Sequence, residues 1–280
     1  MVLRRSLYKT PAQLRAMVEP GLITAEMLDA VRALVAPGVT TAELDAAAAA
    51  VCAARGAESN FQLVRGYRHT TCISVNDQVV HGIPSSRVLE PGDIVSIDAG
   101  AQFAGWNGDS AITLVVPGGP VEVTAARRRL AEVTEASLWA GIAALASARR
   151  VGEIGDAVQG SIERAAAADG AVYGILRDYV GHGIGRRMHE SPTVFNYRVA
   201  DLGPDVRPGL CVAIEPMVTA GTEETFVEDD DWTITTADGS DGAHFEHSVA
   251  VHAGGIWVLT APDGGAAGLA PLGVTPAPIA

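Results

Sequence analysis

The sequence predicts an α+β protein in which two similar halves form one domain. Helical periodicity and short β-rich runs occur along most of the chain. A Pro-Gly turn followed by an apolar run and an acid occurs twice in register, at residues 91–98 and 208–215. A His-Gly-Ile tripeptide precedes each copy, at His81 and at His182, and a helical segment bracketed by glycines lies further upstream. Elements repeated in the same order indicate two copies of one structural unit.

The repeat also sets the expected domain boundaries. We expect a single domain over residues 1–261, with halves at about residues 30–120 and 121–253. Chance similarity among common Gly, Pro and Ile residues is the alternative, and three elements in one order argue against it. Residues 262–280 are rich in Gly, Ala and Pro without periodicity, so we expect a disordered tail there.

The predicted elements follow from local signals. Residues 11–36 have helical periodicity, and because Pro20 interrupts it we expect a kink or two short helices. A capping box that begins at Thr40 opens an Ala-rich helix that ends at Gly56. Two further helices are predicted in the second half, at residues 124–146 and 153–168. The predicted strand segments are residues 63–80 (with a turn), 94–97, 110–116, 212–214, 232–236 and 247–252.

Composition and charge exclude several classes of protein. The 280 residues are 48% hydrophobic, which is not the profile of a disordered chain. The net charge of −13 argues against a protein that binds DNA or RNA through a basic face.

Cysteine usage and hydropathy indicate a cytoplasmic protein. The three cysteines, Cys52, Cys72 and Cys211, are odd in number and widely spaced, which argues against a disulfide framework or a Cys-based zinc site. Residues 1–6 lack the apolar region of a secretory signal. No apolar stretch is long enough to suggest a membrane span, so we expect no membrane association.

Four carboxylates occur next to apolar strand segments: Asp98, Asp109, Glu215 and Glu246. An acid at such a place is usually a salt-bridged strand end, because ionised carboxylates avoid burial unless paired or bound to metal. Here the repeat superposes Asp98 on Glu215, so the acids are expected to meet and repel one another. Divalent cations would relieve that repulsion, and the four together favour a dinuclear site.

The histidines divide into a candidate ligand and candidate substrate contacts. His182 lies between glycines that allow a close approach, which makes it the best imidazole ligand. A dinucleotide-binding loop is the alternative for these glycines, but no strand–loop–helix unit carries them. His81 and His189 lie in loops beside the acids and could polarise a substrate, or be ordinary loop histidines. His244 and His247 are close enough to Glu246 to support it.

Six segments of the sequence resemble the type I methionine aminopeptidases, in the order and spacing of that family. They cover parts of residues 10–253 and are residues 76–84, 92–98, 108–110, 181–185, 214–218 and 245–248. The resemblance implies the pita-bread fold, an antiparallel sheet with two pseudo-symmetric halves flanked by helix pairs. It agrees with the internal repeat. Glu215 and Glu246 are 31 positions apart, which leaves no room for the helical insertion of type II enzymes.

The resemblance also implies a site that holds two divalent metal ions, which could be Co, Mn, Fe or Zn. Asp98 resembles the bidentate ligand of one metal ion. His182 and Glu215 resemble ligands of the other, and Asp109 and Glu246 resemble the pair that bridges both.

The remaining site residues are implied in the same way. Glu215 resembles the residue that takes a proton from the attacking water. His189 resembles the group that hydrogen-bonds the scissile carbonyl, and His81 the donor towards the leaving amide. Three residues fall at positions that line the methionine side-chain pocket: Tyr67, Cys72 and Trp232.

The expected function is removal of the initiator methionine from the N-termini of nascent polypeptides whose second residue is small. The family acts as a monomer in the cytoplasm, near the ribosome exit region. An Xaa-Pro aminopeptidase is one alternative, although those enzymes generally carry a large N-terminal domain and only 80 residues precede His81 here. An inactive pita-bread scaffold is the other, although such proteins typically lose several of the metal ligands.

Overall fold

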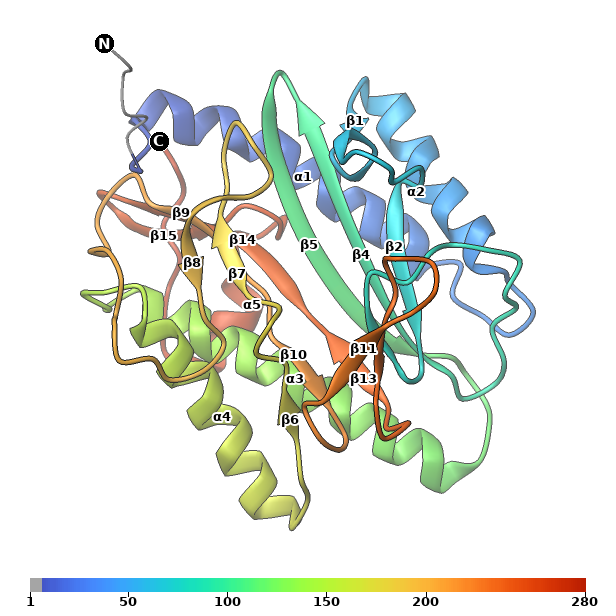
Figure 1. The fold of residues 1–280 in the computed structure, drawn as a ribbon. Helices are drawn as coiled ribbons and strands as arrows, with labels where there is room; N and C mark the ends of the chain where they lie inside the picture. Colours follow the sequence, from blue (N-terminus) through green and yellow to red (C-terminus); the bar gives the residue numbers. More distant parts are fainter. Residues whose placement is uncertain (1–6) are drawn as a thin grey trace.

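A large antiparallel sheet forms the centre of the protein, shown in Figure 1 as a computed structural model that describes residues 7–280. Residues 1–6, on which the expected absence of a signal peptide rests, lie outside the described residues. The strands of this sheet are β1 (Glu58–Ser59), β2 (Thr71–Val75), β4 (Ile94–Phe103), β5 (Trp106–Val115), β7 (Gly181–Gly183), β8 (Glu190–Val194), β9 (Cys211–Ile214), β14 (Glu246–His252) and β15 (Gly255–Val258).

The order of the strands divides the sheet into two sides. The main path runs β1-β4-β5-β14-β9-β7-β8, with β2 paired to β4 and β15 paired to β14. On the main path, strands from the first half of the chain lie on one side of β14, and β9, β7 and β8 from the second half lie on the other. Strand β14 therefore joins the two halves at the middle of the sheet.

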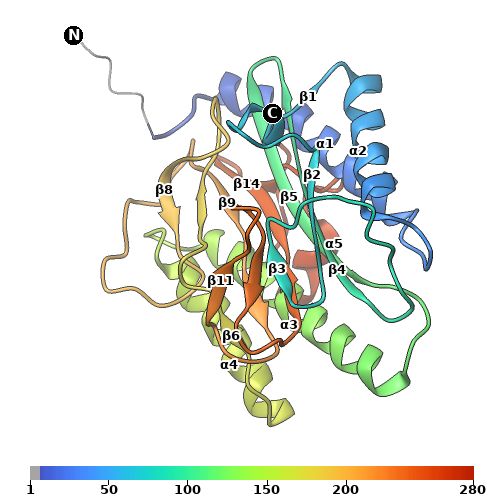
Figure 2. The ribbon, with the colours of Figure 1, turned by 45° about the vertical axis from the view of Figure 1, so that its right-hand side comes forward.

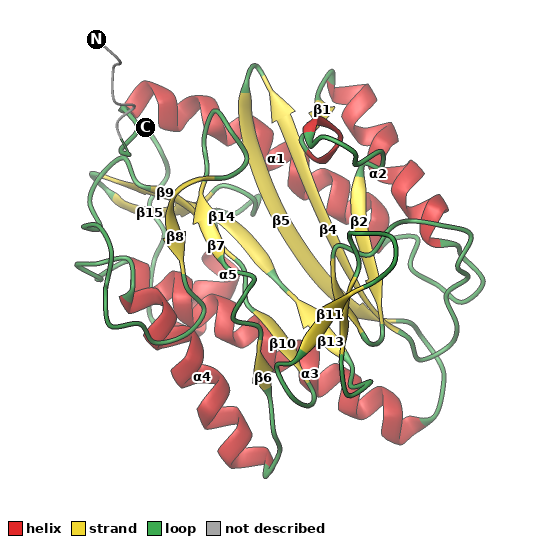
Figure 3. Ribbon diagram, in the orientation of Figure 1, coloured by secondary structure: helices red, strands yellow, loops and turns green. Residues whose placement is uncertain are grey.

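Helices cover one face of the sheet (Figure 3). They are α1 (Pro11–Arg32), α2 (Thr41–Arg55), α3 (Val121–Leu145) and α4 (Glu153–Asp169). Helix α1 packs against α2 ahead of the first strands of the chain, and α3 packs against α4 in the second half. None of the helices within residues 7–280 combines the length and apolar composition that crossing a membrane requires.

Two small sheets complete the structure around the large one. One contains β6 (Gly174–Ile175), β10 (Met217–Thr219) and β13 (Gly242–His244). The other contains β3 (Gln78–Val80), β11 (Thr225–Val227) and β12 (Ile234–Thr236), and Figure 2 shows β3 and β11 in front of the large sheet. The short 3₁₀ helix η1 (Phe61–Leu63) leads into β2.

Helix α1 is continuous through Pro20, so of the two expected outcomes the division into two short helices is wrong. The proline removes one helical hydrogen bond, but its own carbonyl accepts a hydrogen bond from Thr24 Oγ1 at 2.9 Å. Thr24 Oγ1 in turn accepts from the backbone N–H of Ala101 in β4 at 3.1 Å. A Cβ on Gly108 would lie 2.6 Å from the Pro20 carbonyl, so this turn packs directly on strand backbone. Packing against β4 and β5 holds the helix together where local propensity predicts a break.

Local signals at the ends of α2 predict its bounds correctly. Thr40 and Glu43 form both halves of a capping box, and Gly56 ends the helix with φ 64°. In the second half, α4 ends in the same way at Gly170, with φ 63°. The two glycine-bracketed helices of the predicted repeat therefore end in the same way in the structure.

Residues 262–280 are ordered against the domain, which corrects the expected disordered tail. They include α5 (Ala266–Leu269) and the 3₁₀ helix η2 (Ala270–Leu272). Ala277 is tied in twice: its N–H donates to Ile256 O at 2.9 Å, and its carbonyl lies 2.7 Å from His252 Nε2. Gly264 and Gly268 lie directly against the rings of Trp257 and Trp139. Small residues let this segment approach two indole rings closely, which composition alone does not reveal.

Candidate metal centre

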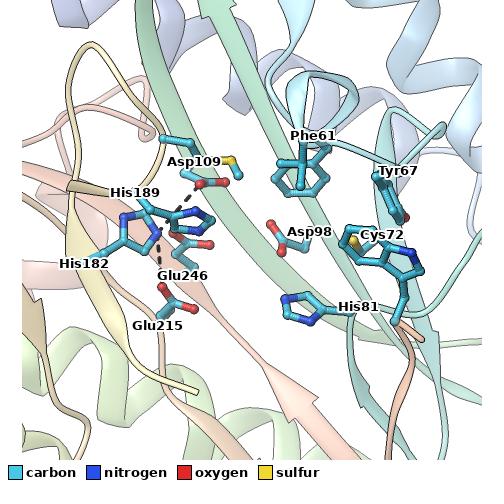
Figure 4. A pocket seen from close by; sticks show the side chains of 13 residues that line it. Phe61, Tyr67, Cys72, His81, Asp98, Asp109, His182, His189, Glu215 and Glu246 are labelled. Atoms are coloured by element: carbon cyan, nitrogen blue, oxygen red, sulfur yellow. Dashed lines mark ion pairs between the residues drawn. The ribbon is translucent and has the colours of Figure 1, made fainter. Parts of the chain in front are cut away.

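A cavity of about 600 Å³ lies where the two halves of the sheet meet (Figure 4). Its walls include every residue that the sequence analysis singled out as catalytic, metal-binding or substrate-binding. The complete lining is Phe61, Val64, Tyr67, Cys72, His81, Asp98, Asp109, His182, Met188, His189, Glu215, Trp232 and Glu246. Residues that are up to 185 positions apart in the chain are thus gathered in one pocket of the size that small ligands occupy.

Strand pairing explains why the acids converge. Asp98 in β4 stands opposite Ala111 in β5, and Ala111 stands opposite Glu246 in β14. Asp109 lies two residues before Ala111 and therefore points to the same face of the sheet. Because Ala111 has a small side chain, it leaves space between Asp98 and Glu246, which flank it across the sheet. The three carboxylates project from adjacent strands into one volume.

The second half adds a carboxylate and an imidazole. Glu215 directly follows Ile214, which pairs with His247 in the central strand β14. Glu215 therefore lies near Glu246 of that strand. His182 comes from β7, and its Nε2 atom lies 3.3 Å from Glu215 Oε1 and 3.9 Å from Asp109 Oδ2 (dashed in Figure 4).

The donor set fits divalent metal ions. One ligand atom each from Asp109, His182 and Glu246 lie within 4.8 Å of one another. Buried oxygens of Asp98, Asp109 and Glu246 have no hydrogen-bond partner among the described residues. Unpaired buried carboxylates are costly, and ions that accept oxygen and nitrogen ligands would satisfy them.

Burial dominates the electrostatics of these acids. It raises the pKa of Asp98 to about 8. Burial, together with the charges of neighbouring acids, raises the pKa values of Asp109, Glu215 and Glu246 well above their ordinary range. Burial therefore disfavours the ionised forms of all four acids in this cavity. Bound cations would stabilise those ionised forms.

Burial lowers the pKa values of the histidines in the pocket and so favours their neutral forms. Burial, and then the charge of His189, lower the pKa of His182 to about 3, so its imidazole is available as a ligand. The rings of His182 and His189 lie edge to face with centroids 4.4 Å apart. His81 faces them from the other half, with φ 61°, and burial followed by His189 lowers its pKa to about 4.

One end of the cavity is aromatic and apolar. Tyr67 packs edge to face on Trp232 with ring centroids 5.0 Å apart, and its hydroxyl donates to Thr71 O at 2.7 Å. Cys72 is buried next to them, and burial raises the pKa of its thiol well above the usual range. The Phe61 ring also belongs to this cluster, and its centroid lies 6.3 Å from the centroid of the Tyr67 ring.

Sequence reasoning missed part of this wall. Phe61, Val64 and Met188 line the cavity but are not among the residues that the sequence analysis assigned to the site. Apolar side chains at 61 and 64, within a polar loop that also contains Tyr67, are the signal that could have found two of them.

His244 and the Ser110–Ser248 pair also surround the acids without contacting the cavity. His244 is 1% exposed, neither of its ring nitrogens has a hydrogen-bond partner within the described chain, and its Nε2 lies 4.0 Å from Glu215 Oε2. Ser110 Oγ donates to the Glu246 carbonyl at 2.6 Å. Ser248 Oγ donates to the Asp109 carbonyl at 2.8 Å and accepts from the Asp109 N–H at 3.1 Å. The two serines therefore fix the backbone of two acids across the β5–β14 pair.

A family of known metal-dependent peptidases matches this sequence, in agreement with the site. The sequence pattern of Metallopeptidase family M24 matches residues 15–253. The chain belongs to metallopeptidase family M24. Family membership and the carboxylate and imidazole cluster together indicate that this M24 peptidase uses divalent metal.

Two bacterial relatives match almost their whole length. Methionine aminopeptidase 1 of Mycobacterium tuberculosis is 44% identical over 253 residues, which cover 90% of this M24 peptidase and 94% of the relative. Methionine aminopeptidase 1 of Bacillus subtilis is 40% identical over 252 residues, which cover 90% and 98%.

Solved structures confirm the expected pita-bread fold. The crystal structure of methionine aminopeptidase from Thermotoga maritima superposes with a TM-score of 0.83 at 35% identity, and the match covers 90% of this chain and 98% of that one. Prolidase from Pyrococcus furiosus shares the fold, with a TM-score of 0.66 at 21% identity over 91% of this chain and 65% of its own.

Proposed function

We propose that this M24 peptidase removes the N-terminal methionine from polypeptides whose second residue is small. The observation that carries the proposal is a single cavity that joins a cluster of four carboxylates and an imidazole, two further histidines and an aromatic, apolar end. The metal centre and histidines supply the chemistry of peptide hydrolysis. The apolar end is suited to an unbranched thioether side chain, because thioethers pack favourably on aromatic rings.

Five residues hold two divalent ions in this proposal: Asp98, Asp109, His182, Glu215 and Glu246. Bound ions supply Lewis acidity and make a water acidic enough to attack near neutral pH. Metals that accept mixed oxygen and nitrogen ligands, such as Mn, Fe, Co or Zn, suit the donor set.

The protein's own groups then position the peptide and move protons. Glu215 accepts a proton from the attacking water. His189 donates a hydrogen bond to the scissile carbonyl oxygen as negative charge develops on it, and His81 donates towards the nitrogen of the leaving amide. Both imidazoles are neutral, so each carries one N–H for this purpose.

The methionine side chain occupies the end formed by Tyr67, Cys72, Trp232 and Phe61. The second residue of the substrate then lies beyond the metal centre, between the His81 and His189 walls. A bulky second side chain would clash there, which favours small residues.

The proposed setting is the cytoplasm, where the enzyme acts as a monomer on nascent chains near the ribosome exit. The net charge of −13 gives no support for contact with ribosomal RNA, so docking would involve ribosomal protein. Co-sedimentation with ribosomes, and the molecular mass of the enzyme in solution, test these two points.

Methionine release from a Met-Ala-Ser peptide tests the activity. Chelated enzyme should be inactive and should regain activity with Mn, Fe, Co or Zn. Glu215→Gln should abolish release, whereas Glu122→Gln, on the first turn of α3, should not. An Ala-Pro-Ala peptide run alongside separates the alternative: cleavage of that peptide alone would contradict the proposal and indicate an Xaa-Pro aminopeptidase.

Metal content tests the ligand set independently of activity. Two ions per chain are expected after reconstitution, and Asp98→Ala should lower the number towards one. An unchanged content in Asp98→Ala would contradict its assignment as a ligand.

A further inference from the structure

A second cavity, of about 610 Å³, opens beside the catalytic pocket. The two cavities share three wall residues, Val64, Met188 and His189. His189 is the proposed donor to the scissile carbonyl, so the part of a substrate that follows the cleaved bond leaves the pocket past this shared wall. The second cavity is therefore placed to receive residues downstream of the first two.

The second cavity has a positively charged lining, although the protein as a whole carries a negative net charge. Beyond the shared wall it is lined by Asn60, Leu63, Gln102, Asn107, Arg186 and Arg187. These residues include two arginines and three amides, and no carboxylate. Glu58 stands opposite Gln102 in the β1–β4 pair but does not line the cavity. A chain with a net charge of −13 thus has a cationic groove next to its catalytic pocket.

Arg186 is fixed in the wall of this groove. Its Nη1 donates to the carbonyl of Ala104 at 3.3 Å and to that of Gly105 at 3.1 Å. Its guanidinium also stacks 4.0 Å above the ring of Trp106. These contacts join the loop between β7 and β8 to the turn between β4 and β5, and they hold one positive charge in place.

Arg187 has a rigid backbone and a free side chain. The Gly185 N–H donates to the Arg187 carbonyl at 3.1 Å, and the Arg187 N–H donates to Glu190 Oε1 at 3.1 Å. Glu190 is itself held by Lys9, whose Nζ lies 3.0 Å from Glu190 Oε2. Within residues 7–280 the Arg187 guanidinium, which is exposed, forms no salt bridge. It is available to bind a ligand, whereas the guanidinium of Arg186 is held by two carbonyls and the Trp106 ring.

We propose that Arg187, supported by Arg186, binds acidic side chains at the third and fourth residues of the substrate. The inference rests on the proposed function and adds a preference for acidic N-terminal regions to it. A guanidinium on a fixed turn matches the planar geometry of a carboxylate. Because the groove is open to water, each acid should raise kcat/KM only about threefold, and salt should weaken the effect.

Peptides Met-Ala-Xaa-Xaa-Gly-Gly with an amidated C-terminus test the inference, with Glu, Gln or Lys at both variable positions. Methionine release by the metal-reconstituted enzyme gives kcat/KM for each. We expect the order Glu, Gln, Lys, with differences that shrink between low and high ionic strength. Arg187→Gln should bring the Glu/Gln ratio close to one, and Arg187→Glu should reverse the order. If a substitution changes kcat/KM equally for both peptides, the Glu/Gln ratio of kcat/KM stays the same.

Arg164→Gln is the matched control, because Arg164 is an exposed arginine on α4 that lines neither cavity. It changes the net charge equally and should keep the Glu/Gln ratio of the unmodified enzyme. Equal rates for the three peptides would overturn the inference while leaving the proposed function intact. A Glu preference that persists in Arg187→Gln would also overturn it. No release from any peptide would overturn the proposed function and the inference with it.

Discussion

Lys9, the only lysine in the sequence, forms a buried ion pair with Glu190, the residue that follows His189. The two side chains are 5% and 18% exposed, and Lys9 Cε lies against Gly185 at the start of the same loop. Burial raises the pKa of Glu190, but hydrogen bonds from Lys9 and from the loop backbone outweigh it and lower the pKa overall. The N-terminal segment therefore supports the loop that carries His189 into the cavity.

Removal of this ion pair should destabilise the protein strongly. Lys9→Met leaves the largely buried Glu190 carboxylate without its cationic partner, which we expect to lower the free energy of unfolding by about 3 kcal/mol. Denaturant unfolding of the metal-loaded enzyme measures it. Arg129→Met, which breaks an exposed pair with Asp169, is the control and should have an effect of about 1 kcal/mol or less. Equal losses in the two variants would contradict the importance of the buried pair.

The metal-free enzyme should lose stability as pH rises. The pKa of Asp98 is raised to about 8 by burial, and those of the other three acids are also raised. A raised folded-state pKa stabilises the protein fully below the unfolded value of about 4, and this stability is lost as pH rises through the folded value. Bound ions oppose the loss because they pair with the ionised acids.

The difference in melting temperature between metal-loaded and metal-free enzyme should therefore widen from pH 5 to pH 8.5. Asp98→Asn removes one of the titrating acids and should reduce the slope for the metal-free enzyme. Below about pH 6 the buried His247, whose pKa burial lowers to about 4, destabilises both forms alike. A difference that stays constant with pH would be incompatible with buried, titrating ligands.

Ser248→Ala should weaken metal binding without removing a ligand. The Ser248 hydroxyl bonds both the N–H and the carbonyl of Asp109, and its loss leaves buried backbone groups unpaired at about 1–3 kcal/mol. Loss of such support typically lowers metal affinity about 10- to 100-fold. Metal titration of the chelated protein measures it, with the exposed Ser147→Ala as control. Unchanged affinity would mean that the β5–β14 pair positions Asp109 without the hydroxyl.

Gly268→Val should destabilise the protein through its contact with Trp139. A Cβ at this helical glycine would overlap the indole ring, and overpacking of this kind costs about 1–3 kcal/mol. Ala267→Val, at the exposed neighbour on α5, introduces the same side chain without the overlap. Thermal unfolding followed by tryptophan fluorescence compares them. If the two variants unfold alike, residues 262–280 do not pack as described.

Local signals made much of the secondary structure predictable. The helix from Thr40 to Gly56 depends on side chains within four residues of its ends, so its bounds can be read from the sequence. Pro20 shows the opposite case, because the contacts that keep α1 continuous come from Gly108 and Ala101 on strands far along the chain. A short stretch of sequence around Pro20 therefore does not include the strand residues that contact it.

The site was partly predictable for a different reason. The repeat places Asp98 and Glu215 at equivalent positions, so their convergence follows from symmetry. The spacing between Asp98 and Glu246 depends instead on the pairing of both with Ala111, which is a property of strand register. Lys9 gave no signal at all, because an isolated charged residue in a sequence does not reveal a partner 181 positions away.

The position of β14 at the middle of the sheet bears on the order of folding. A ribosome makes the chain from its N-terminus, so the first-half strands and β9 are complete before the strand that must pair between β5 and β9 exists. Until residue 252 has emerged, two strands expose unpaired edges and Glu246 is absent from the metal centre. Contacts so distant in sequence form slowly. The large sheet is therefore joined only after β14, the last but one of its strands along the chain, has been made, and a chain that stops before Glu246 lacks one of the proposed metal ligands.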